Sequence, residues 1–215
     1  MKFRSPRTKT AAGIAGLMLL AFPLAACGDD NESADKVQAV ATIENLSGEQ
    51  TEITVDQSFF DTLDALGVTP GVLSNAGLDG NVLSFPITGG NVSVFEPGSV
   101  PNYVVGQIQH ENSGLSLTAG DITVELRNFN VDPTVSRVYG DVVVNGDVAA
   151  TSAYLFRLNG STLKPLQTEG DTAILEGTKV FISDVAAGLL NDTYGIDDVT
   201  DQVLVGVAKI TVNTK

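Results

Sequence analysis

The chain has 215 residues, with 12 Lys+Arg against 26 Asp+Glu and a formal net charge of −14. This acidic balance argues against a nucleic-acid partner and against docking on anionic lipid head groups, because both are bound by basic surfaces. A single cysteine excludes an intrachain disulfide framework. The absence of tryptophan, with 6% aromatic residues, disfavours a carbohydrate-binding module.

The N-terminal segment has the layout of a secretory signal. Four basic residues precede an apolar run over 11–26, and the cysteine follows directly. An uncleaved anchor is the alternative, but 16 residues fall short of the roughly 20 that a spanning helix needs. Leu24-Ala25-Ala26-Cys27 resembles the lipobox of bacterial lipoproteins. The resemblance implies removal of residues 1–26, lipidation of Cys27 (diacylglycerol, with palmitate-type chains), and a lipid-anchored protein facing the extracytoplasmic side of the cell membrane.

Removal of 1–26 would leave 8 Lys+Arg against 26 Asp+Glu, a net charge of −18. Segment 27–36 is short, polar and acidic, and we interpret it as the lipidated cysteine with a flexible tether. No linker or charge block interrupts the chain afterwards. Residues 37–215 are therefore predicted to be a single β-rich extracytoplasmic domain.

The first half of this domain begins with strands predicted over 39–43 and 51–55. A helix follows, because apolar residues recur at i, i+4 and i+7, with Asp56 as a suitable N-cap and Gly67 as its end.

Period-two alternation marks most of the rest as strands with one buried face. The Ala119-Gly120-Asp121 step predicts a hairpin, and Asn145-Gly146 is the strongest hairpin signal in the chain. Strands are expected over 82–85, 92–95, 104–109, 115–117, 122–127, 138–144, 148–158, 173–182 and 203–212.

A second helix is predicted between a cap at Ser183 or Asp184 and a stop at Gly195. Many short strands rich in Val, Ile and Thr, with two short helices, indicate a mainly β fold. We expect an antiparallel β-sandwich or barrel.

The order of these elements resembles the HtaA-type domains, secreted haem-binding modules of Gram-positive bacteria. The resemblance rests on short segments at 82–86, 106–110, 113–117 and 128–132. It implies haem as a possible cofactor, held in the family by a tyrosinate on the first helix in a Ser-Phe-x-x-Tyr pattern. Here segment 58–62 reads Ser-Phe-Phe-Asp-Thr, so Thr62 replaces the tyrosine.

His110, the only histidine, is the candidate ligand-binding residue, since histidine is also a haem ligand. The alternative is a surface or strand-end histidine that supports a turn. Tyr103 lies seven residues upstream as a second candidate, although an odd spacing on a regular strand would place the two on opposite faces unless a bulge intervenes.

Other chemistries find less support. There is no Gly-x-Ser-x-Gly elbow for a nucleophilic serine, and one histidine without a free thiol does not make a zinc site. The acidic residues around Gly195 do not match a calcium loop. The sequence thus predicts no enzyme and no resident cofactor or metal, but a non-catalytic binding or structural module. A carrier of haem or a small hydrophobic ligand is the first alternative, and a carboxylate-dependent hydrolase the second.

Overall fold

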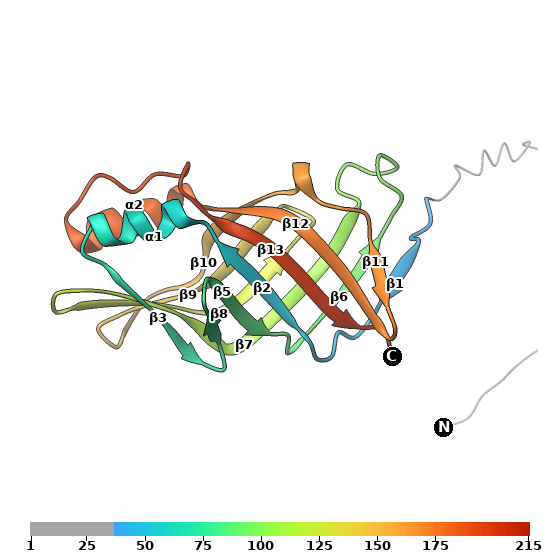
Figure 1. The fold of residues 1–215 in the computed structure, drawn as a ribbon, viewed down its shortest axis with the longest axis horizontal. Helices are drawn as coiled ribbons and strands as arrows, with labels where there is room; N and C mark the ends of the chain where they lie inside the picture. The colour runs from blue at the N-terminus through green and yellow to red at the C-terminus, as the bar shows by residue number, and fades with distance from the viewer. Residues whose placement is uncertain (1–36) are drawn as a thin grey trace, which may run out of the picture. The chain divides into compact units, whose positions relative to one another are not determined.

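The structure is a computed structural model that describes residues 37–215. Cys27 and the tether over 27–36, on which the predicted lipid anchor depends, lie outside the described residues. Thirteen strands form one antiparallel sheet, with two α-helices and a short 3-10 helix (Figure 1). The mainly β, antiparallel fold predicted from the sequence is confirmed.

In the first half of the chain the elements are β1 (Ala41–Ile43), β2 (Gln50–Val55), α1 (Gln57–Ala65), β3 (Thr69–Ser74), β4 (Gly77–Asp79), β5 (Val82–Pro86), β6 (Gly89–Val94) and β7 (Val104–Ala119). In the second half they are β8 (Ile122–Asp132), β9 (Arg137–Val144), β10 (Asp147–Asn159), the 3-10 helix Gly160–Thr162, β11 (Gln167–Glu169), β12 (Thr172–Ile182), α2 (Asp184–Tyr194) and β13 (Leu204–Asn213).

The sheet order is β1-β6-β7-β8-β9-β10-β12-β13-β2-β5-β4, while β3 pairs with β7 and β11 with β12. The sheet curls so that its two halves enclose one apolar core. Strands β1 and β6 line the same small cavity as β12 and β13, although they stand far apart in this order. Side chains on the inner face of every long strand therefore share one interior.

Both helices have the caps expected from the sequence. The Asp56 carboxylate accepts a hydrogen bond from the backbone N–H of Ser58 at 2.9 Å, which begins α1. Ser183 caps α2 through the N–H of Ala186, also at 2.9 Å, and Gly195 ends that helix in the left-handed conformation. The two helices lie at the same end of the sheet (Figure 1), where Phe59 and Leu190 line a common apolar cavity.

The two predicted hairpins are present. Ala119 ends β7 and Ile122 begins β8, while Asn145 and Gly146 join β9 to β10 with φ values of 51° and 92°. Positive φ at both turn residues is typical of the tight turns that match the twist of paired strands.

Other strands differ from expectation. Segments 104–109 and 115–117 belong to a single long strand, β7, because a bulge carries the chain through the polar residues between them. Strands β3, β4 and β11 were not expected from the sequence. They are short or mostly exposed, so they lack the buried alternation that predicts a strand.

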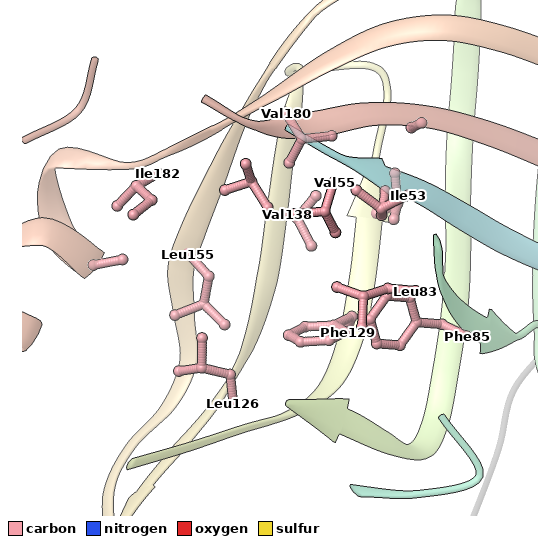
Figure 2. Packing of buried hydrophobic residues seen from close by; sticks show 14 of the residues in the cluster. Ile53, Val55, Leu83, Phe85, Leu126, Phe129, Val138, Leu155, Val180 and Ile182 are labelled. Carbon is pink, nitrogen blue, oxygen red and sulfur yellow. The ribbon is translucent and has the colours of Figure 1, made fainter. Parts of the chain in front are cut away.

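The core is apolar and aromatic at its centre. Phe85 and Phe129 meet edge to face with ring centroids 5.2 Å apart, and Figure 2 shows them beside Leu83 in the interior. Leu155 on β10 is completely buried. Residues 37–215 form one compact unit, and no helix among them is long and apolar enough to cross a bilayer.

Two glycines let β6 and β7 approach closely. Gly106 has a φ of +134°, and a Cβ added there would lie 2.0 Å from the carbonyl oxygen of Asn91. Gly90 has a φ of +115°, and an added Cβ would meet the carbonyl oxygen of Gln107 at the same distance. Any side chain at either position would force the two backbones apart.

We therefore expect Gly106→Ala to lower the free energy of unfolding by about 3 kcal/mol, through backbone strain and the clash with Asn91. The control is Gly188→Ala in α2, where an added Cβ meets nothing within 4 Å. That change should stabilise the protein by up to about 1 kcal/mol, because alanine is the better helix former. Urea unfolding of both variants measures the difference, and a Gly106→Ala protein as stable as wild type would contradict this packing.

Candidate functional site

His110 is the centre of the candidate site. It lies on β7, where Val104, Ile108 and His110 alternate inward before the bulge. The residue is only 1% exposed, among the most deeply buried side chains of the protein. Burial excludes a surface position, but His110 does lie beside the bulge of β7, where its backbone carbonyl accepts a hydrogen bond from the Ser113 hydroxyl at 3.0 Å.

Both ring nitrogens of His110 have hydrogen-bond partners. Nδ1 is 3.2 Å from the backbone carbonyl oxygen of Phe129 on β8, and Nε2 is 2.8 Å from the Thr51 hydroxyl on β2. A carbonyl oxygen can only accept, so Nδ1 carries the proton in the neutral ring. Nε2 then accepts the hydrogen bond that the Thr51 hydroxyl donates.

The surroundings of the ring are apolar. Phe85 meets it edge-on at a centroid distance of 6.5 Å, and Phe129 packs against Phe156 at 5.9 Å. Burial lowers the pKa of His110 from 6.5 to about 4, against the opposing effect of its bond to the Phe129 carbonyl. His110 is therefore neutral at physiological pH.

A cavity of about 110 Å³ adjoins this pair. Its polar lining residues are Thr51, His110 and Thr178, and the rest of the wall is aliphatic or aromatic. The lining comes from both halves of the sheet: Ile53, Leu83, Phe85, Val104, Ile108, Leu115, Phe129, Val131, Pro133, Val138, Phe156, Leu158, Leu163, Leu175, Val180, Val205, Ala208 and Ile210. Such a cavity can hold a small apolar molecule oriented by one polar group.

Two further apolar cavities of about 40 Å³ each flank it. The first shares Ile108, Leu175 and Ile210 with the His110 cavity and lies toward β1 and β6. The second shares Leu115 and Phe156 and lies toward the two helices. Both smaller cavities therefore share part of their wall with the His110 cavity.

On the other side of His110, the bulge between β7 and β8 forms a polar hollow. Asn112 and Asn128 both have positive φ, and the Asn128 side chain accepts a hydrogen bond from the N–H of Asn112 at 3.1 Å. Besides His110 and Phe129, the hollow is lined by amide side chains and one carboxylate, Glu111. Acid–base hydrolysis of a glycoside needs two carboxylates, so this hollow does not support the hydrolase alternative.

Tyr103, the second sequence candidate, precedes β7. It is partly buried against the core but does not line the His110 cavity. Its carbonyl oxygen accepts a hydrogen bond from the N–H of Phe95 at 2.7 Å. The structure does not bring Tyr103 and His110 together in one cavity.

The residues present do not fit haem as they stand. Thr62 lines the cavity near the helices rather than that of His110, and its hydroxyl donates a hydrogen bond to the carbonyl of Ser58 at 2.7 Å. Both nitrogens of His110 are engaged. A cavity of 110 Å³ is also well below the roughly 300–1,000 Å³ of ordinary ligand pockets.

The structure also shows a residue that sequence reasoning missed. Thr51 lies on the same face of β2 as Ile53 and Val55, so period-two alternation places it inward, but no local pattern identifies its partner. It is only 5% exposed, which is unusual for its type. Within residues 37–215, no three His, Cys, Asp or Glu side chains come together in a way that could hold a metal ion.

These features define a curled antiparallel sheet with two helices at one end and a buried histidine in an apolar interior. No family model and no curated protein matches the chain. The fold is similar to the C-terminal domain of HtaA from Corynebacterium glutamicum, with 14% identity and a TM-score of 0.55 over 79% of this chain and 98% of that one. It is also similar to the haem-binding protein HtaB of the same organism, with 10% identity and a TM-score of 0.51 over 80% and 96%. At these identities the likeness extends to the fold alone.

The buried histidine predicts a pH dependence of stability. The unfolded chain, with an ordinary histidine pKa, takes up a proton below about pH 6.5, whereas folded His110 resists protonation down to about pH 4. The free energy of unfolding should therefore fall as the pH falls, by about 2 kcal/mol between pH 7.5 and 5.

Urea unfolding at both pH values measures this difference. In His110→Gln a neutral amide replaces the titrating ring, so most of the decrease should disappear. Carboxylates titrate mainly below this window. A decrease of equal size in the variant would show that another group causes it.

Proposed function

We propose that this protein is a lipid-anchored, extracytoplasmic, non-catalytic binding protein that holds a small apolar ligand in the His110 cavity. The observation that carries the proposal is the cavity itself. It is almost wholly apolar, and its deepest polar feature is the neutral pair of His110 and Thr51. Void volume of this kind weakens packing, so a structural role alone does not account for it.

The size of the cavity limits the ligand. An engineered apolar cavity of about 150 Å³ binds benzene, so 110 Å³ admits a group of similar or smaller cross-section. Two smaller apolar cavities share lining residues with it. A small hydrocarbon group therefore fits better than a broad, rigid ring system.

The ligand proposal is tested with benzene, a probe whose size matches the cavity. Calorimetric titration of wild-type full-length protein should give a saturable heat of binding. Ala208→Leu extends a side chain into the cavity and should weaken binding at least about tenfold, since it removes space for two or three methylene groups. Ala149→Leu, on an exposed part of β10, is the matched control and should bind normally.

Equal binding by Ala208→Leu and wild type would place the probe elsewhere and contradict the proposal. Absence of binding by the wild type would do the same.

Haem is the second candidate, and the fold likeness to the haem-binding protein HtaB favours it. The engaged nitrogens of His110 and the small cavity oppose it. Titrating the same protein with hemin separates the two candidates. We expect no sharpened Soret band; a sharp band that His110→Ala abolishes would establish the haem carrier instead.

The anchor is proposed from the sequence segment that ends at Cys27. Two or more acyl chains would hold the protein at the membrane, because each buried CH₂ contributes about 0.8 kcal/mol and one chain binds only marginally. Mass spectrometry of the membrane fraction should show a mature chain that begins at an acylated Cys27. A Cys27→Ala variant that still fractionates with membranes would contradict the anchor.

A further inference from the structure

The few cations of the described chain are distributed unevenly. Four of them form salt bridges: Arg127 with Glu125, Lys164 with Glu176, Lys209 with Glu52, and Lys215 with Asp171. The other three within residues 37–215, Arg137, Arg157 and Lys179, take part in no salt bridge with a described residue. The chain has 26 acidic side chains, so a shortage of acidic partners does not explain why these three cations form no salt bridge.

These three cations share one face of the sheet. Inward positions of β9, β10 and β12 are taken by Val138, Phe156 and Val180, which line the His110 cavity. The alternation of strands therefore places Arg137, Arg157 and Lys179 on the outer face. Arg137 is exposed and the other two are partly exposed.

Arg137 and Arg157 are direct partners across β9 and β10. Like charges at opposed positions of neighbouring strands destabilise a sheet, so this arrangement has a cost in the free protein. The acidic side chains near this pair are Asp132, the cross-strand partner of Arg137 on β8, and Asp184, at the start of α2. A bound anion would remove the repulsion.

Each guanidinium is also held in place by neighbours. The guanidinium carbon of Arg137 lies 4.5 Å from the centroid of the Tyr154 ring. That of Arg157 lies 4.5 Å from the centroid of the Phe181 ring. Arg157 donates a hydrogen bond to the carbonyl oxygen of Asp201 at 3.2 Å. A guanidinium fixed by stacking loses little freedom when it binds an oxyanion.

Two phenol groups complete the cluster. Tyr139 and Tyr154 are cross-strand partners with ring centroids 6.1 Å apart. Burial raises the pKa of the Tyr154 phenol, against the lowering effect of Arg137 and Arg157, so the phenol keeps its proton and can donate a hydrogen bond.

We propose that Arg137, Arg157, Tyr139 and Tyr154 form a phosphate-binding site on the outer face of β9 and β10. Two guanidiniums and two phenols supply more donors than the two oxygens of a carboxylate can accept, whereas a phosphate group presents three or four oxygens. The acidity of the rest of the protein does not prevent this, because exposed charges beyond about 10 Å are largely screened at 0.1 M salt.

Tyrosine fluorescence can measure binding at this site. It has no tryptophan, and two of its four tyrosines lie in the site, so tyrosine emission reports on binding there. Full-length protein in a neutral detergent is titrated with inorganic phosphate at constant ionic strength. We expect a saturable change in emission and a higher Tm in phosphate, since a ligand of the folded state stabilises it.

Arg137→Gln and Arg157→Gln should each weaken phosphate binding about tenfold or more, because each removes a charged hydrogen-bond donor. Arg137→Lys keeps the charge but not the planar fork and should also bind more weakly than wild type. The matched control is Arg127→Gln, which removes the same charge from an arginine already paired with Glu125. It should bind phosphate normally and shows that net charge alone is not responsible.

The source of the phosphate is distinguished by two further probes, glycerol 3-phosphate as a monoester and glycerophosphoglycerol as the diester of a lipid head group. Comparable binding of the diester supports a phosphodiester-bearing lipid or polymer, while binding of inorganic phosphate and the monoester alone supports a soluble phosphate compound. No response to any of the three, or an equal response to acetate, would overturn the proposal.

Discussion

The interior of this protein depends on one polar contact across an apolar space. His110 on β7 receives its hydrogen bond from Thr51 on β2, and in the sheet order five strands separate β7 from β2. The bond therefore spans the interior of the curled sheet and is not part of the hydrogen-bond ladder between neighbouring strands. Loss of either partner would leave a buried polar group without a hydrogen bond, at a cost of about 1–3 kcal/mol. The same bond fixes which parts of the two halves face each other, which a purely apolar core specifies less strictly.

That contact also determines what the cavity can do. A neutral imidazole can orient a ligand but carries no charge. Both of its nitrogens already have hydrogen-bond partners, so neither is free to bind a metal. The cavity wall is otherwise apolar, so binding there would draw mainly on the hydrophobic effect.

The sequence predicted the parts of the fold that local patterns encode. Asp56 and Ser183 as caps, and Asn145-Gly146 as a turn, each act through neighbouring residues, and all are present. The partner of His110 could not be predicted, because Thr51 lies 59 positions away and meets it only when the sheet curls. Tyr103 precedes β7 and does not line the His110 cavity, so the spacing rule for a regular strand does not decide its position.

Side chains along β9 and β10 alternate between the inner and the outer face of the sheet, so the residues that fill the core determine which residues lie outside. A β-bulge between Tyr154 and Phe156 leaves Leu155 without a partner on β9. Because of that extra residue, Leu155 is buried and Phe156 lines the cavity, while Tyr154 and Arg157 both remain outside. A regular strand would turn two residues three positions apart to opposite faces. The bulge therefore brings the tyrosine pair and the arginine pair onto one surface without withdrawing an apolar side chain from the core.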